Sequence, residues 1–147
     1  MPAMLIRARL VPELLVADLS ASLAFWVGLI GFRIADDRPE DGFAYLDLDG
    51  AQVMLEERDP VSRQWVTGPL DPPLGRGINF QISVPDAAPV IARLEAAGRP
   101  PYMACEERWY RADTIEVGVR QFLVQDPDGY LLRVSSRLGQ RPLRAAV

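Results

Sequence analysis

The chain has 147 residues, of which 49% are hydrophobic and 24% charged, and its formal net charge is −4. This size and composition are typical of one compact globular domain, and no stretch predicts a membrane-spanning helix or a signal peptide. The acidic balance argues against nucleic acid as a partner. The single cysteine, Cys105, excludes an internal disulfide and favours a cytoplasmic location.

The first half of the chain predicts a strand, a helix and three further strands. The alternation over 9–16 indicates the first strand, after which Asp18 or Ser20 can cap a helix that Gly31 ends. Phe25 and Trp26 are expected in the core of that helix. Strands are then predicted at 32–35, 43–48 and 51–57, and Asp49-Gly50 predicts the hairpin turn between the last two.

The second half predicts the same order of elements. Its first strand, 78–84, alternates apolar and polar residues, which indicates one face on the core and one toward water or a polar cavity. A helix at 87–97 follows, then strands at 102–105, 119–125 and 130–135. The Asp128-Gly129 turn joins the last two strands.

The repeated order predicts two modules within a single domain. Module one spans about 5–58, a linker rich in proline and glycine spans 59–76, module two spans about 77–137, and a mobile tail follows at 138–147. Two tandem βαβββ modules predict an α+β fold, in which curved mixed sheets surround a concave cavity and the helices lie outside. A duplicated unit creates a site where its two copies face each other.

Three stretches resemble the vicinal oxygen chelate superfamily, which includes glyoxalase I, extradiol dioxygenases, fosfomycin resistance enzymes and bleomycin resistance proteins. They are 11–19, 25–32 and 122–130, and the likeness covers nearly the whole chain apart from the last ten residues. In the enzymes of this superfamily, four strands each supply one ligand to a divalent metal. The resemblance places these four positions on Val11, Met54, Asn79 and Arg133.

These four side chains are unsuited to a divalent metal. Valine has no donor atom, methionine offers a soft thioether, and arginine carries a permanent positive charge. The chain also contains no histidine, the most frequent metal ligand and general base. We therefore predict no metal and no cofactor. The resemblance then points to the branch of the bleomycin resistance proteins, which are dimers that bind the drug in clefts between subunits without chemistry.

If the four positions face the cavity, the alternation of the strands predicts which other side chains do so. The ligand-binding residues expected on this face are Glu13, Tyr45, Gln52, Met54, Asn79, Gln81, Gln121, Leu123 and Arg133. Polar groups around an apolar base suit an organic ligand with hydrogen-bonding groups. The alternative is a closed cavity in which Glu13 pairs with Arg133.

Further candidates lie in segments expected to be loops. Trp65, Trp109 and Tyr110 could stack on a flat or cationic ligand, and Arg111 could contact an anionic group. The alternatives are that Trp65 packs the linker onto the sheet or forms a dimer contact, and that Arg111 is only a solvated charge. Asp126 and Asp128 are expected to be turn formers.

The sequence thus predicts a non-enzymatic, cytoplasmic homodimer that sequesters a small molecule such as a bleomycin-type antibiotic. One alternative is a metal-free enzyme with Glu13 as the base and Arg133 as an electrostatic stabiliser. Another is a structural or interaction role with an empty cavity. Neither a nucleic acid nor a membrane is expected as a partner.

Overall fold

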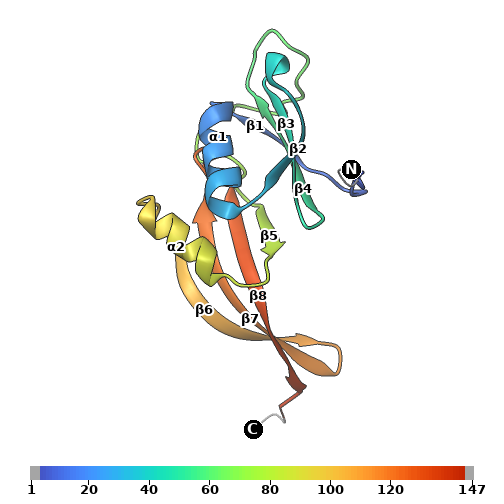
Figure 1. Ribbon diagram of the computed structural model, residues 1–147, viewed down its shortest axis with the longest axis vertical. Helices are drawn as coiled ribbons and strands as arrows, with labels where there is room; N and C mark the ends of the chain where they lie inside the picture. The colour runs from blue at the N-terminus through green and yellow to red at the C-terminus, as the bar shows by residue number, and fades with distance from the viewer. Residues whose placement is uncertain (1–3, 145–147) are drawn as a thin grey trace. The chain divides into compact units, whose positions relative to one another are not determined.

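The computed structural model describes residues 4–144, which form two compact units (Figure 1). The first unit comprises the described chain up to Arg76 together with the turn Asp126–Gly129. The second comprises Gly77–Gln125 and the described chain from Tyr130 onward. Within residues 4–144, no helix has both the length and the apolar character needed to cross a membrane.

The first unit is a four-stranded mixed sheet with one helix. Its elements are β1 (Glu13–Val16), α1 (Leu19–Phe25), the π-helical turn η1 (Trp26–Ile30), β2 (Arg33–Arg38), the 3-10 turn η2 (Pro39–Asp41), β3 (Phe43–Leu48) and β4 (Ala51–Glu57). The strand order is β1-β4-β3-β2, with β1 parallel to β4 and the other pairs antiparallel.

Local sequence explains where these elements begin and end. The Asp18 carboxylate accepts a hydrogen bond from the Ala21 amide at 3.2 Å and caps α1. Gly31 ends the helical segment with φ 112°, a conformation that favours glycine. The Asp49-Gly50 turn has φ 49° and 96°, as the hairpin signal predicted.

The core of the first unit lies on one face of its sheet. Leu14 and Val16 of β1 and Leu55 of β4 are at most 6% exposed. Phe25 and Trp26, each 1% exposed, belong to the helical segment, so the prediction that they form helix core is confirmed. The other face of the sheet carries the residues predicted to bind a ligand.

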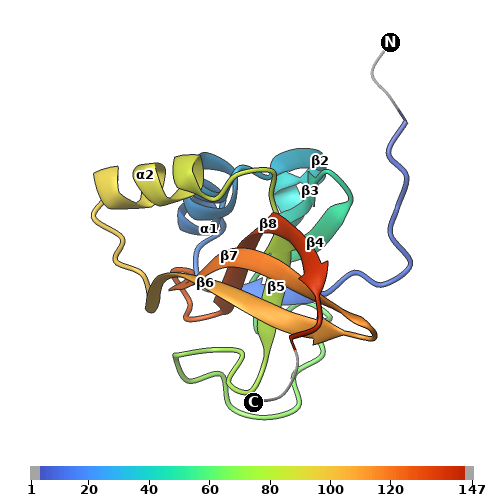
Figure 2. The same cartoon turned by 90° about the horizontal axis from the view of Figure 1, so that it is seen from below.

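The second unit repeats the architecture with longer strands. Its elements are β5 (Asn79–Ser83), α2 (Ala88–Ala96), β6 (Met103–Ala112), β7 (Ile115–Gln125) and β8 (Leu131–Pro142). The order is β5-β8-β7-β6, again with one parallel pair, β5 with β8. Figure 2 shows α2 on one side of this sheet, and the buried side chains Val90 and Leu94 of α2 belong to its core.

Two sequence predictions about the second unit were wrong. Trp109, Tyr110 and Arg111 lie in strand β6, not in a loop, and β8 continues to Pro142, past the expected end at 135. The charged run in 106–108 hides the alternation that identifies a strand. Main-chain pairing of β6 with β7, and of β7 with β8 as far as Ile115 with Pro142, defines these strands instead.

Candidate ligand-binding site

Four of the predicted residues share one face of the first unit's sheet. The register pairs Glu13 with Met54, and Met54 with Tyr45, so these three side chains form one row across β1, β4 and β3. Gln52 lies two residues before Met54 and is therefore on the same face. This face is opposite to the one that carries Leu14 and Val16.

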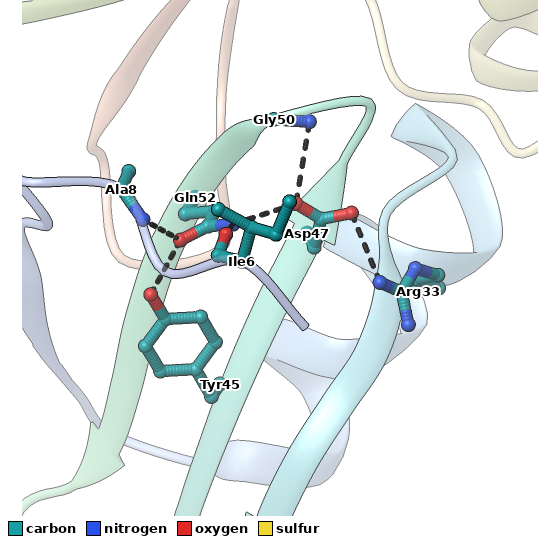
Figure 3. A network of polar contacts seen from close by, with 7 residues as sticks. All are labelled: Ile6, Ala8, Arg33, Tyr45, Asp47, Gly50 and Gln52. Carbon is teal, nitrogen blue, oxygen red and sulfur yellow. Dashed lines mark hydrogen bonds and ion pairs between the residues drawn. The ribbon is translucent and has the colours of Figure 1, made fainter. Parts of the chain in front are cut away.

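Gln52 is fully occupied by contacts within the chain (Figure 3). Its amide oxygen accepts hydrogen bonds from the Tyr45 hydroxyl and, at 2.7 Å, from the Ala8 amide. Its amide nitrogen donates to the Ile6 carbonyl at 2.8 Å and to the Asp47 carboxylate at 2.9 Å. A primary amide can make about four hydrogen bonds, so no capacity is left for a ligand in this arrangement.

The segment 4–10, here called the N-terminal strap, is held over this face by Gln52 and by Arg7. The Arg7 guanidinium lies 4.6 Å from the centroid of the Tyr45 ring and 3.7 Å from the Asp36 carboxylate. The strap exposes its own apolar side chains, since Ile6 is 85% exposed. The sequence of the strap has no periodic pattern of apolar residues, so the sequence did not predict its contacts with Gln52 and Tyr45.

Glu13 lies near a second carboxyl group on the same face. Burial raises the pKa of Glu13, and so do the hydrogen bond and the negative charge of Glu56, while the charge of Arg38 lowers it. In the pairing of β1 with β4, Glu56 lies opposite Leu15, and Leu15 is two residues after Glu13. The carboxyl groups of Glu13 and Glu56 are therefore neighbours on adjacent strands. The adjacent Glu57 points to the other face, where it accepts from the Leu19 amide at 3.0 Å.

Five of the predicted residues share one face of the second unit's sheet. Gln81, Arg133 and Leu123 form one row across β5, β8 and β7, and Asn79 lies two residues before Gln81. In the next row, Gln121 is 5% exposed and donates to the Tyr110 hydroxyl at 2.6 Å and to Glu106 at 3.1 Å. The predicted residue Tyr110 thus also lies on this face, together with Glu106, which is not among the predicted residues.

Arg133 is only partly satisfied in this unit. Its Nη2 donates to the Gln81 amide oxygen at 2.5 Å. Its Nε is buried and has no hydrogen-bond partner among the described residues. Glu13 and Arg133 belong to different units, and an ion pair between them stays a prediction.

Trp109 and Arg111 lie on the opposite face of the second sheet from Tyr110. The Trp109 ring packs on Gly118, and the Arg141 guanidinium lies 4.1 Å from the ring centroid. Arg111 pairs in register with Glu116, whose carboxylate binds Arg141 at 2.6 Å. These two candidates are therefore not brought together with the row that contains Arg133.

Trp65 lies in the linker and is 76% exposed. The Arg63 guanidinium lies 5.3 Å from the centroid of the Trp65 ring. This exposure argues against packing of Trp65 onto the sheet of its unit and leaves its role in ligand binding a prediction.

Asp126 and Asp128 form the expected turn, and they also anchor it to the first module. Asp126 accepts from the Asp128 amide at 2.9 Å and from the Trp26 indole at 3.1 Å. Asp128 accepts from the Ala17 amide at 3.0 Å and from the Ser22 hydroxyl at 3.4 Å. Sequence reasoning assigned only local contacts to these carboxylates, because nothing in their spacing indicates partners about a hundred residues away.

Two cavities within the units lie outside the predicted residues. One of about 690 Å³ lies in the first unit and is lined by the start of α1, η2 and the end of β4. The other, of about 150 Å³, lies between α2 and the β6–β7 pair and includes Cys105. Burial is the largest cause that raises the pKa of the Cys105 thiol. The positive charge of Arg120 lowers this pKa, and the negative charges of Glu107 and Glu106 raise it.

The positions that the resemblance assigns to metal ligands carry side chains that are unsuited to a divalent metal. Met54 and Arg133 are on the two sheet faces described above, and neither has the donor chemistry of a hard divalent cation. Within residues 4–144, no group of three or more histidine, cysteine or acidic side chains is arranged to hold a metal ion.

A family model named the glyoxalase/bleomycin resistance protein/dioxygenase superfamily matches residues 8–134. The chain belongs to this superfamily. A superfamily member from Vibrio splendidus 12B01 is 38% identical over 86% of this chain and 95% of its own, with a TM-score of 0.40. No curated protein matches the chain at a significant level.

Solved structures of lower sequence identity share the fold. TioX from Micromonospora sp. ML1 is 24% identical, with a TM-score of 0.67 over 89% of this chain and 99% of its own. Lactoylglutathione lyase from Agrobacterium tumefaciens is 20% identical, with a TM-score of 0.56 over 92% of this chain and 96% of its own. At this level of identity the two likenesses show the fold alone, and one fold can carry unrelated activities.

Proposed function

We propose that this protein is a non-enzymatic binding protein that sequesters a small organic molecule of the bleomycin type, without a metal. It acts as a cytoplasmic homodimer. The proposal is supported by the residues at the four positions that the resemblance assigns to metal ligands, which are Val11, Met54, Asn79 and Arg133. Without suitable donors, the metal-dependent reactions of the superfamily have no Lewis acid.

The two sheet faces support binding of an amphipathic ligand. Each face combines polar groups with apolar ones: Glu13 and Met54 on the first unit, and Gln81, Arg133 and Leu123 on the second. Ligand sites are usually apolar surfaces with a few placed polar groups that fix orientation.

Isothermal titration calorimetry with bleomycin, with and without a chelator, tests this function. We expect saturable binding that the chelator leaves unchanged, and weaker binding by Asn79→Ala on the same sheet face. Gln140→Ala, an exposed glutamine far along β8, is the matched control. Absence of heat, or binding that the chelator abolishes, would contradict the proposal. Light scattering after size exclusion tests the dimer, and a monomer at the concentrations used for binding would reject it.

The raised pKa of Glu13 favours a second candidate, a metal-free enzyme in which Glu13 acts as the base. Native mass spectrometry can identify a molecule retained during purification. If that molecule keeps its mass on incubation with the protein, sequestration is supported. A mass change that Glu13→Gln abolishes would support the enzyme instead.

A further inference from the structure

Of the two neighbouring donors Nε and Nη2 on the Arg133 guanidinium, only Nη2 has a hydrogen-bond partner among the described residues. Nε and Nη2 lie on the same edge of a guanidinium, where they can bind both oxygens of a carboxylate or phosphate. Here Nη2 donates to a single amide oxygen, that of Gln81, and the buried Nε has no partner among the described residues. Unsatisfied buried donors are rare in native proteins, so this one calls for an explanation.

The surroundings of Arg133 within its unit leave its charge uncompensated. Its row contains Gln81, Leu123 and Met103, which are all neutral. Among the strand residues described on this face, the only carboxylate is Glu106, in the next row. Its oxygen is hydrogen-bonded to Gln121 and lies 3.7 Å from Arg108.

The same face carries further positive charge. Arg108 and Arg137 flank Val119 in a third row, so three arginines stand against one glutamate on this face. The chain as a whole is acidic, with a net charge of −4. A local positive surface on an acidic protein raises the concentration of anions at that surface.

We propose that Arg133 is an oxyanion-binding residue, and that the ligand carries a carboxylate or phosphate group that replaces Gln81 on the Nε–Nη2 edge. The apolar side chains of Leu123 and Met103 continue the same row and offer a surface for the ligand's ring or chain. This inference rests on the proposed binding function for the location of the site. It selects a sequestered molecule that carries an oxyanion, which bleomycin itself does not.

Three small probes test the charge that the site selects. Benzoate and phenyl phosphate carry the two oxyanions on the same ring, and benzamidine is their cationic counterpart. We expect one or both anions to bind with a Kd on the order of 1 mM and to shift the Arg133 Nε–H signal in nitrogen-edited NMR spectra. The stronger anion distinguishes a carboxylate from a phosphate ligand. Equal binding of benzamidine, or an unmoved Arg133 signal, would overturn the proposal.

Variants locate the binding group. Arg133→Met should weaken benzoate binding about tenfold or more, and Arg133→Lys, which keeps the charge but loses the fork, should also weaken it. Arg99→Met, an exposed arginine that follows α2 and lies off this face, should stay within about twofold of the unmodified protein. The NMR shift in the unmodified protein keeps the test informative if Arg133→Met unfolds. Unchanged benzoate affinity in a folded Arg133→Met would reject the site.

Glu13→Gln separates an external anion from an internal one. If an external oxyanion is the partner of Arg133, the Arg133 Nε–H signal of the benzoate-free protein is the same in Glu13→Gln as in the unmodified protein. A changed signal, or a large gain in benzoate affinity, would show that Glu13 already binds the guanidinium, and it would overturn the proposal. Titration with bleomycin tests the proposed function separately. If benzoate binds and bleomycin does not, only the drug class is rejected. If bleomycin binds and benzoate does not, only the oxyanion site is rejected.

Discussion

The Tyr45 hydroxyl and the Ala8 amide donate to the same oxygen, that of the Gln52 side chain. Tyr45 is 2% exposed, so Gln52 links a buried side chain on the sheet face opposite to Leu14 and Val16 to the N-terminal strap. A ligand that used Gln52 would have to compete with the main chain of the strap. In this structure Gln52 is therefore an anchor for the strap, and the polar groups of the second unit are more available.

Gln52→Ala should release the strap. The substitution removes both main-chain contacts of the strap with the sheet and leaves the buried Tyr45 hydroxyl unpaired, at a cost of about 1–3 kcal/mol. Trypsin should then cleave after Arg7 and Arg9 about tenfold faster, since cleavage follows the population of the open form. Gln140→Ala is the control, and equal cleavage rates in the two variants would show that Gln52 does not hold the strap.

Gly118→Ala should destabilise the second unit. A Cβ at position 118 would lie 2.7 Å from the Trp109 ring, which Arg141 covers on the same face of the sheet. The ring must move or the strands must shift, which costs about 1–3 kcal/mol in urea denaturation. Gly28→Ala is the matched control, because its Cβ would meet no atom within 4 Å. Similar midpoints for the two variants would contradict this packing.

Asp128→Ala should weaken the attachment of the turn to the first module. It leaves the Ala17 amide and the fully buried Ser22 hydroxyl without their acceptor. We expect a loss of about 1–3 kcal/mol in the free energy of unfolding, measured by chemical denaturation. Asp71→Ala in the exposed linker serves as the control. If both variants unfold at the same denaturant concentration, the buried contacts of Asp128 contribute little.

The raised pKa of Glu13 predicts a dependence of stability on pH. The folded state binds the Glu13 proton more tightly than the unfolded state does, so this contribution is present below the ordinary glutamate pKa. It is lost as the pH rises through the folded pKa. Glu13→Gln should therefore lose less stability than the unmodified protein between mildly acidic and neutral pH. Parallel denaturation curves over that range, with Glu95→Gln as the control, would refute the coupling.

The separation of Trp109 and Tyr110 onto two faces predicts different effects on ligand binding. Tyr110→Ala removes a side chain bonded to Gln121 on the face of Arg133, and it should weaken binding of the ligand about tenfold. Trp109→Phe, on the opposite face, should leave affinity within about twofold. Calorimetry with a probe that binds the unmodified protein measures the affinity of both variants. A larger loss of affinity in Trp109→Phe than in Tyr110→Ala would place the ligand on the Trp109 face.

The sequence by itself determined the two-module fold and most element positions. A turn signal such as Asp49-Gly50, and the apolar pattern of the helical stretch with Phe25 and Trp26, depend on neighbouring residues alone. Both can therefore be recognised in a short stretch of sequence. Strand alternation also placed Glu13, Tyr45, Gln52 and Met54 on one face, and Gln81, Arg133 and Leu123 on another, because the side-chain period of a strand is two.

Only the tertiary structure decided which of these groups are already in use. The length of β6 depends on its pairing with β7, and the parity of Trp109 and Tyr110 follows from that pairing. Two hydrogen bonds join the strap to Gln52 and one joins Trp26 to Asp126, and both contacts link residues far apart in the chain. Such contacts produce no periodic pattern in the sequence. They depend on which distant segments the folded chain brings together, not on local composition.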